Sequence, residues 1–327
     1  ELTSALPIRR LPFAPQLILP LSQHAGAPAV PLVKPGQEVV RGEPVARADG
    51  FVSVPMHAPA TGRVEAIQLM PSARGPKTPS MLLHVYEGSG QEVLYGSTRD
   101  VQRMTPEEIL QAVQDSGMVG LGGAAFPTHV KMKPPPEHTV DTLVVNGCEC
   151  EPYLTCDHRI MLEQTADVLA GARIIMRGLG VGRAMIGVED NKPDAVAAIA
   201  AKLPEHGRIS VHAVQTKYPQ GAEKMLIKAV TGREVPSGKL PASVGALVQN
   251  VATTASVALV FDTGANRWHG LEAWPPPGPN RLKPFSASSA ATIELALDPR
   301  PLPIGRRLVS LTRSGRISTP RWPAASW

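Results

Sequence analysis

Residues 143–153 have the sequence LVVNGCECEPY, in which a short apolar run gives way to a polar, acidic turn. The run Leu143–Val145 predicts a buried strand. The segments that follow alternate in type: we expect helices at 158–177, 193–203 and 221–230, and strands at 184–188 and 209–214. Strand–helix alternation at this spacing predicts a parallel, Rossmann-like α/β domain over residues 101–235.

The turn after this first strand is a candidate ligand site. In open α/β sheets, ligands bind beyond the carboxyl ends of the strands, where Asn146, Glu149 and Glu151 would converge. Carboxylates accept hydrogen bonds from ribose hydroxyls, and an Asn side chain can bond the polar edge of a flavin in both directions. Taken alone, however, the cluster fits a solvated turn better than a site.

A glycine-rich stretch, GMVGLGGAAFPTHVK, occupies residues 117–131. It is not a GxGxxG motif and it follows an expected helix, not a strand, so the dinucleotide fingerprint does not apply. Gly120, Gly122 and Gly123 nevertheless allow a concave nest of backbone N–H groups for a phosphate or a ring edge. Lys131 could neutralise a phosphate, and Phe126 could stack on an aromatic ligand. A flexible loop with a packed Phe explains the same residues equally well.

Residues 23–100 have a different pattern, with short β-type segments separated by turns such as Asp49–Gly50. Asp-Gly between β runs is a strong hairpin signal. The pattern resembles a lipoyl/biotinyl-type barrel-sandwich module, but residues 48–51 (ADGF) place no lysine at the hairpin tip for a covalent carrier. We therefore expect a docking module, preceded by an extended arm at 1–22. Downstream, Thr105 and Glu108 predict a capping box that begins a helix running to about Asp115.

Composition limits the possible functions. No run of 18 or more apolar residues occurs, so no transmembrane helix is expected, and residues 1–10 lack the apolar core of a signal peptide, which favours the cytoplasm. Residues 265–327 hold nine basic and three acidic residues, while the rest of the chain holds 24 and 25. The basic charge thus belongs to an irregular, Pro-, Arg- and Trp-rich tail, and we expect no nucleic-acid partner. The tail is either a linker or sequence outside the ancestral reading frame.

Four motifs in fixed order carry a resemblance: GLGGAAFPTHVK at 120–131, NGCECEPY at 146–153, YPQGAEK at 218–224 and TGREVPSG at 231–238. Over about residues 5–255 the chain resembles the RnfC (RsxC) family, the C subunits of the Rnf electron transport complexes. The same motifs are similar to those of the NADH-oxidising flavoprotein of respiratory complex I. The resemblance implies FMN and NAD(H) as cofactors, and residues 236–264 as the start of a third, SLBB-like segment.

The resemblance also implies roles for individual residues. Those expected to contact FMN are Gly120, Gly122, Gly123, Lys131, Asn146 and Glu149; Phe126 and Glu151 belong to the NADH side; Tyr218, Gly221 and Glu223 line the flavin pocket; Asn250 and Thr253 close it near the phosphate. One position departs from the pattern, because Cys148 stands where the complex I flavoprotein has an Asp.

Iron–sulfur clusters are the larger departure. The family continues into a ferredoxin-like part whose two C-x-x-C-x-x-C-x-x-x-C-P repeats hold two [4Fe–4S] clusters. Cys148, Cys150 and Cys156 are the three cysteines of this chain, too few and wrongly spaced for that role. We expect the ferredoxin-like part to be missing and the thiols to be ordinary buried or loop cysteines, with a metal site as the lesser alternative.

Together these observations predict one component of a membrane-bound complex that couples electron transfer (NADH oxidation through FMN, or the reverse) to ion translocation. Other membrane and peripheral subunits of the complex are the expected partners, and they would hold the chain at the cytoplasmic face of the bacterial inner membrane. A soluble flavin-dependent NADH dehydrogenase and a truncated, non-catalytic assembly module are the alternatives. No catalytic acid or base is expected, because the cofactors carry out hydride transfer themselves.

Overall fold

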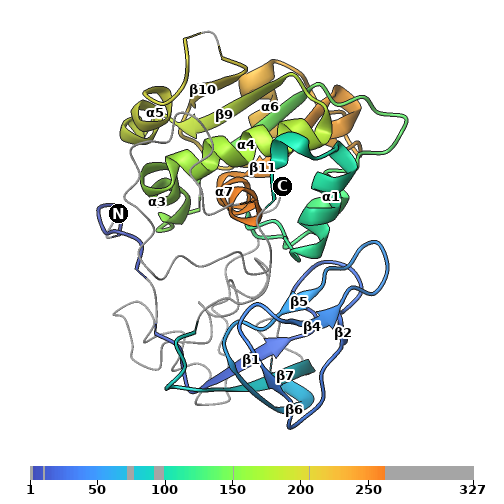
Figure 1. Ribbon diagram of the computed structural model, residues 1–327. Helices are drawn as coiled ribbons and strands as arrows, with labels where there is room; N and C mark the ends of the chain where they lie inside the picture. Colours follow the sequence, from blue (N-terminus) through green and yellow to red (C-terminus); the bar gives the residue numbers. More distant parts are fainter. Residues whose placement is uncertain are drawn as a thin grey trace, which may run out of the picture.

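The computed structural model describes residues 3–9, 12–71, 77–91, 99–149, 151–205 and 207–261. The described part forms a smaller antiparallel β unit and a larger α/β unit. In Figure 1 the β unit lies below the α/β unit. The predictions made for Cys150 and for residues 265–327 fall outside these ranges.

Short strands make up the N-terminal unit: β1 (Gln16–Pro20), β2 (Val30–Pro31), β3 (Glu38–Val39), β4 (Pro44–Arg47), β5 (Met56–His57), β6 (Gly62–Pro71) and β7 (Lys77–Val85). They form two antiparallel sheets, ordered β1-β7-β6-β3 and β2-β4-β5. Apolar side chains of both sheets, among them Val45, Val64 and Leu83, share one core. The barrel-sandwich fold expected from the turn pattern is confirmed.

The expected arm at 1–22 is wrong for its second half. β1 pairs with β7 from Gln16–His84 to Pro20–Ser80. Leu17 and Leu19 point into the core and are each 1% exposed, which is the alternation of a half-buried strand. The prolines around this segment made the alternation of apolar residues hard to recognise in the sequence.

The hairpin signal at Asp49–Gly50 is confirmed, because β4 and β5 pair antiparallel and Gly50 has a φ of +86°. Residues 51–54 belong to the connection between β4 and β5. This connection, residues 48–55, is called the tip loop below.

A parallel sheet forms the centre of the α/β unit, with the order β10-β9-β8-β11. Its strands are β8 (Thr142–Gly147), β9 (Arg183–Glu189), β10 (Ile209–Val214) and β11 (Ala246–Asn250). Side chains of β8 alternate between two cores: Leu143 and Val145 face one side, and Val144 faces the other. The sheet is buried on both faces, as expected for parallel strands, and the Rossmann-like prediction is confirmed.

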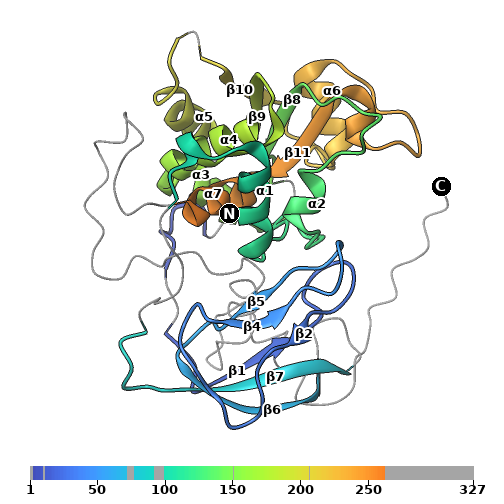
Figure 2. The same ribbon diagram turned by 45° about the vertical axis from the view of Figure 1, so that its right-hand side comes forward.

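Helices cover both faces of this sheet (Figures 1 and 2). They are α1 (Pro106–Asp115), α2 (Thr128–Lys131), α3 (Cys156–Glu163), α4 (Thr165–Leu179), α5 (Pro193–Ala200), α6 (Glu223–Thr231) and α7 (Val251–Val260), with short 3₁₀ turns at Val101–Arg103 and Pro241–Val244. The helices α1, α4 and α7 pack on one face and α6 packs on the other. The capping box of Thr105 and Glu108 begins α1 as predicted.

Two details differ from the sequence-based expectation. The helix expected over 158–177 is split into α3 and α4 at Gln164, whose φ of −121° and ψ of 29° are not helical. In addition, β11 pairs in parallel with β8 from Ala246–Thr142 to Asn250–Asn146. Residues 246–260, expected to start a third segment, are therefore part of the α/β unit, and the expected boundary at 235 does not separate two cores.

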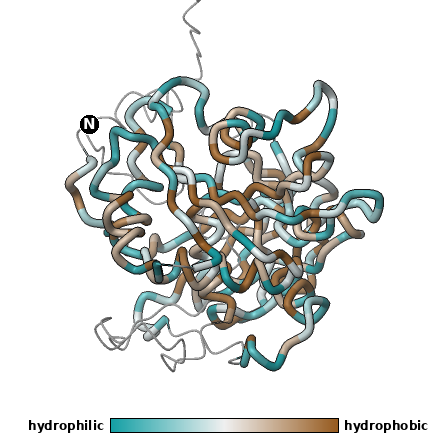
Figure 3. The backbone as a smooth tube through the Cα atoms, turned by 90° about the horizontal axis from the view of Figure 1, so that it is seen from above, coloured by the Kyte–Doolittle hydropathy of each residue, from teal (hydrophilic) through white to brown (hydrophobic). Residues whose placement is uncertain are grey.

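The hydropathy of the chain follows this arrangement. Hydrophobic stretches run through the middle of the view in Figure 3, and hydrophilic ones occupy the outer loops. Within the described residues, no helix has both the length and the apolar character needed to cross a bilayer.

Candidate functional site

The acidic turn begins where β8 ends, at the carboxyl edge of the sheet. Asn146 donates from Nδ2 to the carbonyl oxygen of Gly221 at 2.8 Å, and its Oδ1 accepts from the backbone N–H of Cys148 at 3.0 Å. The side chain therefore ties the turn to the segment that leads into α6. Two parts of the chain that sequence analysis assigned to one flavin pocket meet here.

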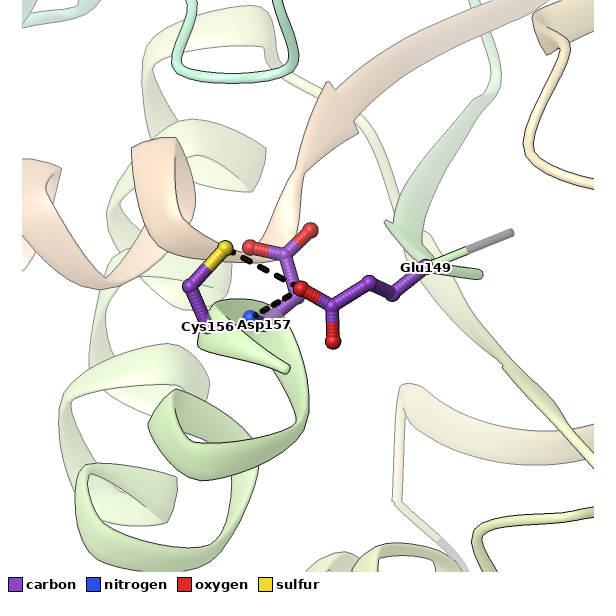
Figure 4. A group of neighbouring side chains, drawn as sticks. All are labelled: Glu149, Cys156 and Asp157. Atoms are coloured by element: carbon purple, nitrogen blue, oxygen red, sulfur yellow. Dashed lines mark hydrogen bonds between the residues drawn. The ribbon is translucent and has the colours of Figure 1, made fainter. Parts of the chain in front are cut away.

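Glu149 is 6% exposed, and its carboxylate lies against the first turn of α3 (Figure 4). Oε1 accepts from the backbone N–H of Asp157 at 2.9 Å and from the Cys156 thiol at 3.0 Å, and Oε2 accepts from the backbone N–H of His158 at 3.2 Å. Helix N-termini have free N–H groups and a positive end of the helix dipole, so they stabilise a buried carboxylate. The N-terminus of α3 thereby holds the Glu149 carboxylate in place.

Asp157 lies beside Glu149 and accepts a hydrogen bond from Asn250 Nδ2 at 2.6 Å. Burial, with the nearby charge of Glu149, raises the pKa of Asp157 to about 7, although the Asn250 hydrogen bond and the charge of Lys192 oppose the rise. Burial and the hydrogen bond to Glu149 raise the pKa of Cys156 to about 12, so its sulfur is a neutral thiol at pH 7.

These three side chains bring their ligand-type atoms within 4.8 Å of one another. Glu149 already accepts three hydrogen bonds from α3, and the Cys156 thiol is held protonated. Because metal ligands must be deprotonated, we interpret the group as a hydrogen-bonded helix terminus.

The glycine stretch forms a loop that is closed at its base. Val119 and Pro127 form an isolated β-bridge, and Gly120 N–H donates to the Phe126 carbonyl at 2.8 Å. On the α7 side, Leu121 N–H donates to Thr253 Oγ1 at 2.8 Å. This region, residues 119–127, is called the glycine loop below.

The backbone geometry favours glycine at positions 122 and 123. A Cβ on Gly122 would lie 3.3 Å from Cβ of Asn250, a tight contact, and Gly123 has a φ of +105°, which L side chains rarely adopt. Gly122, Gly123 and Ala124 are exposed, and their backbone N–H groups have no acceptor within the described part of the chain. The loop thus offers a run of free donors, as a phosphate or ring-edge site requires.

Lys131, on α2, forms an ion pair with Glu223 at the start of α6. This pair completes a ring made of side-chain contacts and of the short chain segments between them. Contacts join Leu121 to Thr253, Thr253 to Asn250, Asn250 to Asp157, Asp157 to Glu149, Asn146 to Gly221, and Glu223 to Lys131. The chain itself joins Glu149 to Asn146 and Gly221 to Glu223. The structure therefore brings together most of the residues that the motifs predicted.

Three predicted residues have side chains exposed to solvent. Phe126 is 38% exposed, Tyr218 is 77% exposed, and Glu151 is also exposed. The NADH-side assignment of Phe126 and Glu151 stays a prediction.

Sequence reasoning missed two charged residues, Glu189 and Lys192, of which Lys192 is close enough to act on the pKa of Asp157. Glu189, the last residue of β9, forms a buried ion pair with Lys192 at 2.7 Å. Polar residues at the end of a buried strand are the same signal that identified Asn146. Asp157 was missed because the helix was expected to start at His158, two residues after the start of α3 at Cys156.

A separate hollow of about 550 Å³ lies at the amino ends of β9 and β10, at the opposite edge of the sheet. Arg173, Arg177 and Arg208 line it, but Arg177 is already bonded to the carbonyls of Gln102 and Met104. We assign it no part in the site.

The fold and the ring define a class: a parallel α/β domain of the flavin-binding type, preceded by a barrel-sandwich unit. Residues 113–259 match the Nuo51 FMN-binding domain family, and residues 1–86 match the RnfC barrel sandwich hybrid domain family. With both domains present in this order, the chain belongs to the RnfC family, the C subunits of Rnf complexes.

Curated relatives agree with this assignment. The chain is 44% identical over 270 residues to the C subunit of the Na(+)-translocating ferredoxin:NAD(+) oxidoreductase complex of Acetobacterium woodii, covering 81% of this chain and 60% of the relative. It is 43% identical over 264 residues to the proton-translocating counterpart of Clostridium ljungdahlii, covering 80% and 57%. It is 42% identical over 259 residues to the C subunit of the ion-translocating oxidoreductase complex of Pseudomonas aeruginosa, covering 79% and 33%. The matched region thus spans between a third and three fifths of each relative's length.

Proposed function

We propose that this chain is the FMN- and NADH-binding part of the C subunit in an ion-translocating ferredoxin:NAD(+) oxidoreductase complex. The observation that carries the proposal is the closed ring of contacts at the carboxyl edge of the sheet, with the free glycine-loop amides beside it. The family match adds that this edge belongs to an FMN-binding domain.

FMN fits the residues on two counts. The glycine loop has little room for a Cβ at Gly122 and presents unpaired N–H donors, which suit a phosphate or the polar edge of the ring. Lys131, at the end of the short helix that directly follows the loop, supplies a cation. FMN would supply the hydride chemistry, and the chain would bind and orient it.

In this proposal, residues in the ring of contacts bind different parts of the cofactor. The amides of Gly122 and Gly123 and the ammonium of Lys131 hold the anionic end of the cofactor, with Thr253 fixing the loop. Asn146 and Glu149 lie at the polar edge of the ring system. Phe126 and Glu151 are exposed and are assigned to NADH, which has to enter and leave, and the exposed Tyr218 is assigned to the lining of the flavin pocket.

The complex and its location are part of the proposal. Membrane and peripheral subunits would receive the electrons from, or deliver them to, the flavin, and would hold this chain at the cytoplasmic face of the inner membrane. The [4Fe–4S] clusters of the relay would be held by cysteines other than Cys148 and Cys156. Co-purification with membrane subunits separates this function from that of a soluble dehydrogenase.

Reconstitution of the purified chain with FMN tests the proposal. We expect a yellow protein whose flavin absorption bleaches when NADH is added anaerobically. Lys131→Met should weaken FMN binding, whereas Lys34→Met, an exposed lysine of the barrel unit, should not. A protein that stays colourless after reconstitution would refute the flavin assignment and favour the non-catalytic assembly module.

A further inference from the structure

The β unit and the arm before it contact the α/β unit at three places next to the walls of the proposed flavin site. The first is the tip loop. The carbonyl oxygen of Phe51 accepts a hydrogen bond from His129 Nε2 at 2.9 Å, and the two rings meet edge to face with centroids 5.6 Å apart. Lys133 Nζ lies 5.6 Å from the centre of the Phe51 ring. Phe51 is therefore held from two sides by α2 and its next turn.

His129 is a fixed partner in this contact. It is 1% exposed, and burial lowers the pKa of its ring while the Phe51 hydrogen bond opposes the change. The ring is then neutral at pH 7, and because a carbonyl can only accept, the proton resides on Nε2. His129 lies two residues before Lys131 on the same short helix. The tip loop thus sets the position of the helix that presents Lys131.

A second bond joins the β unit directly to the glycine loop. Ala25 N–H donates to the carbonyl oxygen of Ala125 at 3.0 Å, and Ala125 has a φ of +47°, an unusual value for a residue with a Cβ. Ala25 is itself held firmly, because a Cβ on the adjacent Gly26 would collide with the carbonyl oxygen of Val52 at 2.0 Å. The β unit therefore helps to keep the glycine loop in a conformation that costs energy.

The N-terminal arm makes the contact with the other wall. Thr3 and Thr155 share a hydrogen bond between their hydroxyls at 2.7 Å, and Arg159 Nη1 donates to the Ser4 carbonyl at 3.1 Å. Ile8 N–H donates to the Glu163 carboxylate at 3.1 Å. These contacts run along α3, the helix whose first turn binds Glu149.

We propose that the barrel-sandwich unit is a clamp that sets the spacing of the two walls of the flavin site, with Phe51 as its main positioning residue. This inference rests on the proposed function, since it concerns the same site. The two units have separate hydrophobic cores, so their contacts are not needed to bury either core. The contacts of the tip loop, of Ala25 and of the arm fall instead on the glycine loop, on α2 and on α3, three elements that contribute to the proposed flavin site.

The test measures FMN binding by the full chain, using FMN fluorescence quenching and the visible circular dichroism of the bound flavin. Phe51→Ala should weaken FMN binding about tenfold and change the flavin dichroism, because misplaced donors lose bond strength. Phe51→Tyr, which keeps the ring, should restore both. Leu69→Ala is the matched control, since Leu69 is 59% exposed against 51% for Phe51 and lies on β6 away from the contact.

Each outcome decides one question. If the wild type binds FMN and Phe51→Ala binds it equally well with the same dichroism, the clamp is refuted and the flavin assignment stands. If the wild type does not bind FMN, both fail. If Phe51→Ala does not fold, as judged by far-ultraviolet dichroism, Lys133→Met and Ile8→Pro replace it. Each removes one contact of the clamp, and binding weakened about twofold supports the clamp, whereas unchanged binding refutes it.

Discussion

The glycine loop and the acidic turn face the same site but are built in opposite ways. The glycine loop presents backbone N–H groups, is held by few hydrogen bonds, and depends on backbone angles that most residues disfavour. The acidic turn presents side chains: the buried Glu149 carboxylate accepts hydrogen bonds from the N-terminus of α3, and the neighbouring, half-buried Asp157 accepts one from Asn250 at the start of α7. One wall is therefore sensitive to the volume of a side chain, and the other to charge and pH.

Removal of Glu149 should have the largest effect. Glu149→Ala leaves the N–H groups of Asp157 and His158 and the Cys156 thiol without their acceptor, which should cost about 3 kcal/mol in the free energy of unfolding. Urea unfolding measures the loss. Glu107→Ala, which removes an exposed carboxylate from the first turn of α1, is the control and should cost about 0.5 kcal/mol. Equal losses of stability in the two variants would show that the buried hydrogen bonds of Glu149 stabilise the fold no more than those of an exposed carboxylate.

Ionisation of Asp157 should have the next largest effect. Its pKa is raised in the folded state, so the folded protein keeps a proton that the unfolded chain releases between about pH 4 and pH 7. This contribution to stability is present at low pH and is lost as the pH rises through 7. Asp157→Asn should therefore be more stable than the wild type by about 2 kcal/mol at pH 8 and nearly equal to it at pH 5.

Unfolding experiments across pH 5–8 check this, with Asp190→Asn as the control. Hydrogen bonds from Thr216 lower the pKa of Asp190, so its contribution is lost only at pH values below this range, and the difference between Asp190→Asn and the wild type should stay constant from pH 5 to pH 8. A pH-independent difference between Asp157→Asn and the wild type would contradict the prediction.

Crowding of the glycine loop should have a smaller effect, and on binding more than on stability. Gly122→Ala places a Cβ 3.3 Å from Asn250, which shifts the loop and should weaken FMN binding about tenfold, or about 1.4 kcal/mol. Gly182→Ala is the control, because a Cβ there meets nothing within 4 Å. Isothermal titration with FMN compares the two; identical affinities would mean that the loop has room to spare.

The ion pair between Lys131 and Glu223 should contribute least. The two side chains are 29% and 41% exposed, so solvent screens their attraction. A double-mutant cycle of Lys131→Met and Glu223→Gln should give a coupling of about 0.5 kcal/mol in the absence of FMN, reduced further in 1 M salt. A coupling free energy several times larger would mean that this ion pair stabilises the fold as strongly as the buried groups of the acidic turn do.

The sequence predicted the parts of the fold that local patterns determine. The run Leu143–Val145, the capping box at Thr105 and the Asp49–Gly50 turn each depend on neighbours within a few residues, and each was placed correctly. β11 was missed because Ala246–Asn250 contains the polar Gln249 and Asn250 and lies outside the strand–helix alternation. Its place beside β8 depends on a pairing across about a hundred residues.

The motifs and the family resemblance proposed residues for the site but not the bonds between them. Asn146 and Glu149 lie in a motif and Asn250 follows from the resemblance, yet nothing in the order of residues shows that Asn250 donates to Asp157, 93 positions away. The contact between Phe51 and His129 joins residues 78 positions apart in two different units. Such contacts arise from tertiary packing, so they need coordinates.

The late position of β11 and α7 in the chain has a consequence for synthesis of the protein. β11 and α7, encoded last in the described part, supply Asn250 and Thr253 to a site whose other residues begin at Gly120. A nascent chain on the ribosome can form the barrel unit and the strands β8 to β10 early. Under the proposed function, the cofactor site cannot be complete until residues 246–260 have left the exit tunnel, so flavin binding would follow translation of that segment.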